Sequence, residues 1–155
     1  MAKILVKISG DVNEDQGMHN FIRGNAEKNT VVVICGAGKQ INKVLKENGF
    51  LISFGELGRE IGSDREWKLI LKVLMDESRK VSNYFSYSLH NLIVIPSLHM
   101  AGPIACPRNG DDLVKDFYLG FQNPEDRIIV YTTKDREKKK QEIFKNYPRV
   151  EIKTI

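Results

Sequence analysis

The sequence predicts an α/β protein, a three-layer αβα sandwich with a mostly parallel sheet in the middle. Short runs of β-branched and apolar residues recur along the chain, and several are apolar at nearly every position, as in strands buried on both faces. Helical patterns lie between these runs, which favours parallel strands joined by crossover helices. With 155 residues, the chain has the length of one compact domain, so we expect a single domain over residues 1–155.

Four strands are predicted from apolar runs that end at a polar residue, a glycine or a proline. They cover residues 3–8, 30–35, 91–95, where Pro96 is expected to end the strand, and 127–131. Near the end of the chain, Val150, Ile152 and Ile155 are spaced as in a last strand at the edge of the sheet.

Helices are predicted between these strands. Met18, Phe21 and Ile22 give a first, weak helical stripe. Ser63 and Glu66 form a capping box, which starts a long helix over 64–84. The other predicted helices cover 39–48, 109–119 and a basic segment, 134–145.

The first two strands each run into a glycine turn, and together these turns resemble a phosphate-binding edge. Ligands of parallel sheets bind beyond the carboxyl ends of the strands, where small residues let backbone N–H groups approach an anion. Lys7 and Lys39 add a positive charge to each turn. Alternatively, the glycines only permit tight turns. The candidate phosphate-binding residues beside Lys7 are Ser9, Gly10, Gly36, Ala37, Gly38 and Lys39.

Two common nucleotide motifs do not fit the second turn. A Walker loop requires glycine and a hydroxyl residue where Val33 and Gln40 stand. The dinucleotide fingerprint requires a small residue where Ile41 stands. The turn therefore belongs to neither class.

Four segments, in order along most of the chain, resemble the amino acid kinase superfamily of aspartate, glutamate and uridylate kinases. Lys7-Ile8-Ser9-Gly10 is similar to its opening Lys-Leu-Ser-Gly, and VVVICGAGKQINKVLKENGF resembles the second glycine loop and helix of N-acetylglutamate kinases. Gly58-Arg59 with Ser63-Asp64 is similar to their Leu-Arg-x-Thr-Asp segment. Asn109-Gly110-Asp111, followed later by RIIVYTTKD, resembles their Asn-Ala-Asp helix and the next strand.

This resemblance implies a role for each matched residue. Lys7 would neutralise the transferred phosphoryl group, and Asp111 would orient Lys7 or help to hold Mg²⁺. Arg59 and Asn109 would bind the substrate, and Thr132 and Lys134 would lie at the nucleotide, with ATP and Mg²⁺ as cofactors. Without such roles, Arg59 is a solvated loop residue and Asp111 only complements a helix dipole.

The function predicted from this resemblance is ATP-dependent phosphoryl transfer to a small carboxylate or a nucleoside monophosphate. The chain is shorter than the family enzymes, and Ala37 and Pro107 depart from their motifs. A non-catalytic module that binds a metabolite or nucleotide, or forms oligomers, is therefore the alternative. Family members commonly dimerise through the helix matched by 64–84, so we expect a homo-oligomer. Replacement of Lys7 should weaken phosphate binding with little loss of stability. Gly38→Val should weaken phosphate binding and also destabilise the fold.

Composition and charge narrow the kinds of ligand and the cellular setting that we expect for this protein. The net charge of +4 suits an anionic small molecule, and the basic run 134–140 is interpreted as a solvated helix face. No aromatic residues interleave with that run, which argues against nucleic acid. Cys35 and Cys106 are expected to be reduced thiols in a cytoplasmic protein without a membrane segment. His19, His90 and His99 lack the spacing of metal ligands, so no metal site is expected.

Overall fold

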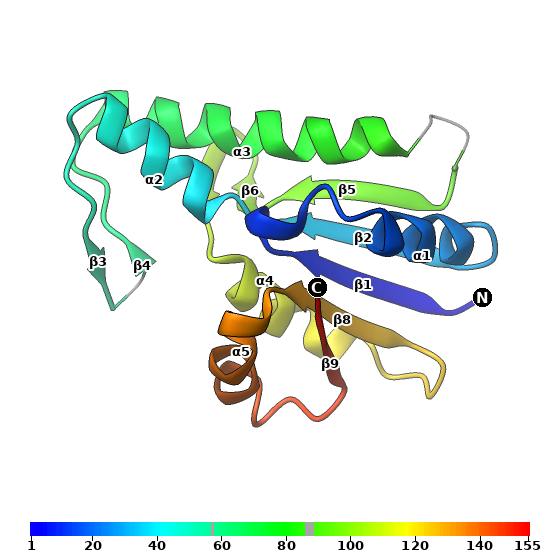
Figure 1. The fold of residues 1–155 in the computed structure, drawn as a ribbon. Coiled ribbons are helices and arrows are strands. Elements are labelled where there is room, and N and C mark those ends of the chain that lie inside the picture. The colour runs from blue at the N-terminus through cyan, green and yellow to red at the C-terminus, as the bar shows by residue number, and fades with distance from the viewer. Residues whose placement is uncertain (57, 86–88) are drawn as a thin grey trace.

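The computed structural model describes residues 1–56, 58–85 and 89–155. Within these ranges, five parallel strands form one sheet in the order β5-β2-β1-β8-β9 (Figure 1). The strands are β1 (Lys3–Ile8), β2 (Thr30–Cys35), β5 (Leu92–Pro96), β8 (Arg127–Thr132) and β9 (Val150–Thr154). The predicted α/β class and its mostly parallel sheet are confirmed.

Helices cover both faces of the sheet and make the outer two layers. They are α1 (Gln16–Ala26), α2 (Gly38–Glu47), α3 (Asp64–Tyr84), α4 (Gly110–Phe117) and α5 (Glu137–Ile143). Alternate side chains of β1 separate the two cores. Ile4, Val6 and Ile8 pack with α1 and the last turns of α3, whereas Leu5 packs with α4 and with Phe144 just beyond α5. Helix α2 packs mainly on α3.

Three predicted boundaries were wrong in detail. Pro96 belongs to β5, because β5 is an edge strand and a proline there costs no ladder hydrogen bond on its open side. The basic segment is a 3₁₀ turn, Lys134–Arg136, followed by the shorter α5. Similarly, the helix predicted over 109–119 ends at Phe117 and continues as a 3₁₀ turn, Tyr118–Gly120.

Two short hairpins escaped sequence prediction. Strands β3 (Phe54–Gly55) and β4 (Gly58–Arg59) pair with each other, as do β6 (Leu98–Ala101) and β7 (Ile104–Pro107). The β3–β4 hairpin projects beyond the carboxyl edge of the sheet (Figure 1). These short strands bury little apolar surface, so they leave no clear alternating pattern in the sequence.

The two glycine turns lie side by side at the carboxyl edge of the sheet, as predicted. The Gly36 N–H donates to the Ile8 carbonyl oxygen at 2.8 Å. A Cβ atom on Gly10 would lie 2.9 Å from the Gly36 carbonyl oxygen. Glycine at position 10 is therefore required by the close approach of the two turns.

No helix in the part of the chain that the structure describes combines the length and the apolar content needed to cross a membrane.

Candidate anion-binding site

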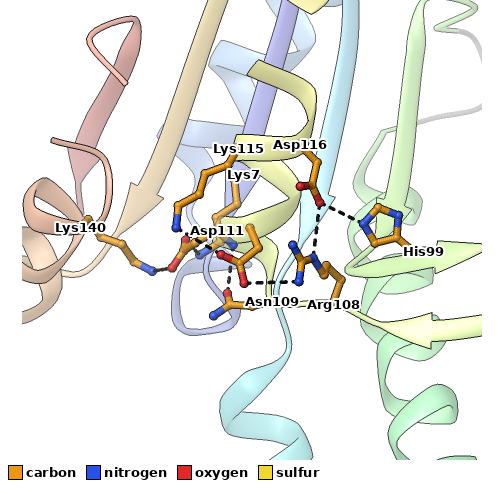
Figure 2. Close-up of polar contacts among 9 residues, drawn as sticks. Lys7, His99, Arg108, Asn109, Asp111, Lys115, Asp116 and Lys140 are labelled. Carbon is orange, nitrogen blue, oxygen red and sulfur yellow. Dashed lines mark hydrogen bonds and ion pairs between the residues drawn. The ribbon is translucent and has the colours of Figure 1, made fainter. Parts of the chain in front are cut away.

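Two buried lysines share one buried aspartate at the carboxyl edge, on the face of the sheet that α4 covers. Lys7 Nζ lies 3.3 Å from Asp111 Oδ1, and Lys140 Nζ donates to Asp111 Oδ2. The side chains of Lys7, Asp111 and Lys140 are 6%, 6% and 9% exposed. Figure 2 shows the three side chains converging from β1, α4 and α5. We call Lys7, Asp111 and Lys140 the charged cluster.

Each member of the charged cluster is placed by its own element. Lys7 follows Leu5 on the same face of β1, because side chains two positions apart in a strand share a face. Asp111 lies in the first turn of α4, where the Asn109 side chain accepts a hydrogen bond from the Asp111 N–H at 3.0 Å. A Cβ atom on Gly110 would lie 3.2 Å from Lys7 Cε, so glycine there lets α4 approach the lysine.

The cluster holds two positive charges against one negative charge. The pKa of Lys7 is lowered to about 8, mainly by burial; the charge of Asp111 opposes this shift, and the charge of Lys140 adds to it. Burial alone would raise the pKa of Asp111, but the charges of Lys7 and Lys140 hold it below its usual value. The site therefore carries an uncompensated positive charge in a region of low water access.

Hydroxyl groups border the cluster. Lys7 Nζ donates to Ser9 Oγ at 2.9 Å. Thr132 lies on β8 two residues beyond Val130, which pairs with Lys7, so the two side chains point to the same face. The Thr132 side chain is buried, and its Oγ1 atom has no hydrogen-bond partner. Thr132 thus brings an unused hydroxyl to this face of the sheet.

The structure does not bring the second lysine of the glycine turns to the charged cluster. The side chain of Lys39 is 77% exposed, and its Nζ lies 3.4 Å from Asp11 Oδ1. Arg136 binds the other oxygen of Asp11 at 3.1 Å. The Gly36 N–H is also unavailable to a ligand, because the Ile8 carbonyl accepts it. The expectation that Lys39 and the Gly36 N–H act beside Lys7 is corrected by these contacts.

The two other side chains assigned by resemblance lie outside the cluster. Arg59 donates to Asn42 Oδ1 at 2.5 Å, and its guanidinium stacks over the Phe54 ring at 4.8 Å. Arg59 is thus not a freely solvated loop residue, and its described polar contacts do not include Asp111. Lys134 is exposed in the 3₁₀ turn after β8. Roles for these residues in ligand binding stay predictions.

Sequence reasoning missed Lys140, because it interpreted the whole basic run as solvated. Lys140 is buried, whereas its neighbours Lys138 and Lys139 are exposed. The signal was present in the spacing, since Ile143 and Phe144 lie three and four residues later and both pack in the core. A lysine on the apolar face of an amphipathic helix is a candidate for a buried ion pair.

The residues present do not fit a protein-held magnesium ion. Among the described residues, no group of three or more His, Cys, Asp and Glu side chains could hold a metal. Both oxygens of Asp111 face lysines, which leaves no carboxylate in the cluster for Mg²⁺. Of the two roles that resemblance implied for Asp111, the contacts fit the orientation of Lys7.

A comparison with protein-family models finds no match, and a search of curated proteins finds no relative. Among solved structures, the chain is similar to N-acetylglutamate synthase from Neisseria gonorrhoeae, crystallised with coenzyme A and L-arginine. The TM-score is 0.66 at 8% sequence identity, over 86% of this chain and 44% of that one. The chain therefore spans less than half the length of this neighbour. The likeness concerns the fold, and supports a distant amino acid kinase-like fold without placing the chain in a family.

Proposed function

We propose that this chain binds a phosphorylated small molecule at the charged cluster and transfers a phosphoryl group from ATP to a small carboxylate or a nucleoside monophosphate. The observation that carries the proposal is the pair of buried lysines that share a single aspartate, Asp111. A buried excess of positive charge is costly unless a ligand of opposite charge compensates it. The fold, with its glycine turns at the same edge, supports the choice of a phosphoryl group.

The donor count favours a phosphoryl group over a smaller anion. Each lysine carries three N–H donors; Lys140 donates one to Asp111, and Lys7 forms an ion pair with the other Asp111 oxygen. Ser9 accepts one more hydrogen bond from Lys7, and the Thr132 hydroxyl is unused. The remaining donors would bind the oxygens of a phosphoryl group in charge-assisted hydrogen bonds.

Phosphoryl transfer depends mainly on position and electrostatic stabilisation, which this cluster would provide. Lys7 and Lys140 would neutralise the equatorial oxygens of the group in transfer, and Asp111 would hold both ammonium groups in place. The backbone N–H of Gly10 and those at the start of α2 would contribute further donors. Because the described residues assemble no set of protein ligands for Mg²⁺, no step assigned to the chain uses a metal that the protein holds.

The alternative is a module that binds the anion without turnover. The contacts of Arg59 favour this alternative, because the predicted acceptor-binding side chain is engaged by Asn42 and Phe54 and not by residues of the charged cluster. Such a module would keep the phosphate affinity and lack an assembled acceptor site.

Binding is tested by calorimetry with inorganic phosphate, ADP and ATP, each with and without Mg²⁺. Wild type should bind in both conditions, and Lys140→Met should bind about tenfold more weakly because it loses a charge-assisted contact. Lys139→Met is the matched control, since Lys139 is exposed one position away and should leave the affinity unchanged. Absence of binding at millimolar concentration, or full affinity in Lys140→Met, would overturn the proposal.

Turnover is tested separately by release of ADP from ATP in the presence of small carboxylates or nucleoside monophosphates. ADP release that depends on the acceptor and is lost in Lys7→Met supports transfer. Binding without acceptor-dependent release selects the non-catalytic alternative.

A further inference from the structure

The hairpin of β6 and β7 carries a cysteine and a histidine directly opposite each other. Cys106 pairs with His99 in the antiparallel ladder. Side chains at directly opposed positions point to the same face of a ladder, and their Cβ atoms lie about 4.5–5.5 Å apart. Both residues are exposed, so a molecule in solution can reach them. The hairpin thus holds a thiol beside an imidazole at the protein surface.

An aspartate on α4 fixes the orientation of this imidazole. His99 Nε2 lies 3.0 Å from Asp116 Oδ2, and Figure 2 shows this contact beside Arg108, which binds the same oxygen. Burial alone would raise the pKa of Asp116, but hydrogen bonds from His99 and Arg108 hold it below its usual value. Asp116 is therefore a carboxylate, which can only accept a hydrogen bond. In the neutral imidazole, Nε2 then carries the hydrogen, and Nδ1 is the ring nitrogen that can accept a proton.

The basic nitrogen of His99 is the one nearer to the hairpin backbone. Nδ1 is bonded to Cγ, the ring atom attached to Cβ, whereas Nε2 is at the far end of the ring and reaches α4. The sulfur of Cys106 is itself bonded to Cβ. The two atoms that would exchange a proton therefore both lie close to the ladder that holds His99 opposite Cys106. A thiol, an imidazole and a carboxylate in this order are the groups that activate a nucleophilic cysteine.

The other cysteine of the chain has the opposite environment. Cys35 is 1% exposed at the end of β2. Burial, with a smaller contribution from the charge of Glu77, raises the pKa of Cys35 to about 12. The thiolate is the reactive form of cysteine, so Cys35 is expected to be inert at neutral pH. The chain therefore contains an unreactive thiol against which the reactivity of Cys106 can be measured.

We propose that Cys106 is a modification site for small disulfides, with His99 as its base and Asp116 as the residue that positions His99. The Cys106 thiol gives its proton to His99 Nδ1, and its sulfur attacks one sulfur of the disulfide R–S–S–R. The S–S bond breaks, and its electron pair leaves with the second sulfur, which takes the proton from His99 as R–SH. Cys106 is oxidised to the mixed disulfide Cys106–S–S–R while half of the small disulfide is reduced. The site shares no residue with the charged cluster, so it does not depend on the proposed phosphoryl transfer.

The probe is oxidised glutathione, added to the wild-type protein at neutral pH, and the products are followed by intact mass and peptide mapping. One glutathione should be attached, on Cys106, and Cys35 should stay unmodified. Cys106→Ser should remove the reaction. No attachment to wild type, or attachment to Cys35 at the same rate, would contradict the proposal. A disulfide between two copies of the chain as the only product would contradict the choice of a small disulfide.

Matched variants test the roles of the imidazole and the carboxylate. His99→Gln should slow the attachment at least about tenfold, because a positioned base takes the proton in wild type. Asp116→Asn should slow it several-fold, because an amide can donate as well as accept and no longer fixes the tautomer. The controls are His90→Gln, an exposed histidine outside the hairpin, and Asp112→Asn, one turn earlier on α4, and both should react at the wild-type rate.

The pH profile separates a base from a residue that only supports the hairpin. In His99→Gln, the rate should rise more steeply between about pH 6 and 8 than in wild type, because only the solvent then takes the proton from the thiol. A purely structural effect would change the rate by the same factor at every pH. Parallel profiles, or a full rate in His99→Gln, would overturn the assignment of His99 as the base.

Discussion

Lys140 and Asp111 are separated by 29 positions in the chain, yet the lysine on α5 donates to the carboxylate on α4 in the interior of the protein. The contact ties the last helix to the edge of the sheet where the glycine turns lie. It also turns an ordinary buried ion pair, Lys7 with Asp111, into a cluster with excess positive charge. The candidate site therefore requires the final α5–β9 segment, and not only the glycine turns.

The charge balance of the cluster predicts that Lys140→Met lowers the stability of the protein slightly and that Asp111→Asn lowers it strongly. Lys140→Met replaces a buried charge by an apolar side chain and leaves a one-to-one pair, so the free energy of unfolding should fall by no more than about 1 kcal/mol. Asp111→Asn leaves two buried lysines without a counter-charge and should cost about 3–5 kcal/mol. Urea unfolding measures both. Asp112→Asn, which removes only the partly exposed partner of Lys115, is the control and should cost less than about 1 kcal/mol.

A double variant tests whether charge causes these effects. Lys140→Met in the Asp111→Asn background removes one of two uncompensated charges, so it should recover part of the lost stability, about 1 kcal/mol or more. Additive losses in the double variant would mean that packing, and not charge, dominates the cluster.

The depressed pKa of Lys7 predicts a pH dependence of stability. Between about pH 8, its pKa in the folded protein, and 10.5, its usual value, the folded protein has lost a proton that the unfolded chain still binds. The unfolded state then binds more protons, so the Lys7 contribution to stability rises with pH across this window and is absent below it. Urea unfolding at pH 8, 9 and 10 should show a steeper rise in wild type than in Lys7→Met.

The difference in the free energy of unfolding between wild type and Lys7→Met, taken at each pH, isolates the contribution of Lys7. Burial raises the pKa of Cys35 to about 12, so its thiol gives the opposite slope at high pH, and this slope cancels in the difference. Parallel curves for wild type and Lys7→Met would show that Lys7 keeps an ordinary pKa.

Two glycines of the turns should respond in opposite ways to alanine. A Cβ atom on Gly10 would meet Gln40 Oε1 at 2.5 Å and the Gly36 carbonyl oxygen at 2.9 Å, so Gly10→Ala should cost about 1–3 kcal/mol. A Cβ atom on Gly38 would meet nothing within 4 Å, and Gly38 is not among the glycines with positive φ. Gly38→Ala should therefore leave stability unchanged or raise it by up to about 1 kcal/mol, as measured by thermal unfolding.

An added Cβ at Gly38 meets no clash, so the structure gives no support for strain there, and the effect of Gly38→Val stays a prediction. The clash lies at Gly10, where the two turns approach each other, and a motif alone does not show which glycine makes that approach. If Gly10→Ala proves neutral, the Gln40 side chain moves aside easily, and the contact between the turns is looser than described.

The structure gives a different physical basis for the expectation that loss of Lys7 costs the fold little. The Lys7 side chain is only 6% exposed and is paired with Asp111. Its removal leaves Lys140 to neutralise the carboxylate, so the stability of Lys7→Met depends on a partner that sequence reasoning had placed in solvent.

The sequence by itself determined the layered fold, because strands buried on both faces must be apolar throughout and the turns that end them must be small. Runs such as 3–8 and 30–35 show both features, and resemblance placed Lys7 and Asp111 in one site. Tertiary structure alone decided that Lys140 joins them, that Lys39 pairs with Asp11, and that Arg59 is held by Asn42. Helical and strand periodicities report which face of an element is buried. The partner of a buried charge depends on how elements far apart in the chain pack together, and no local pattern encodes that.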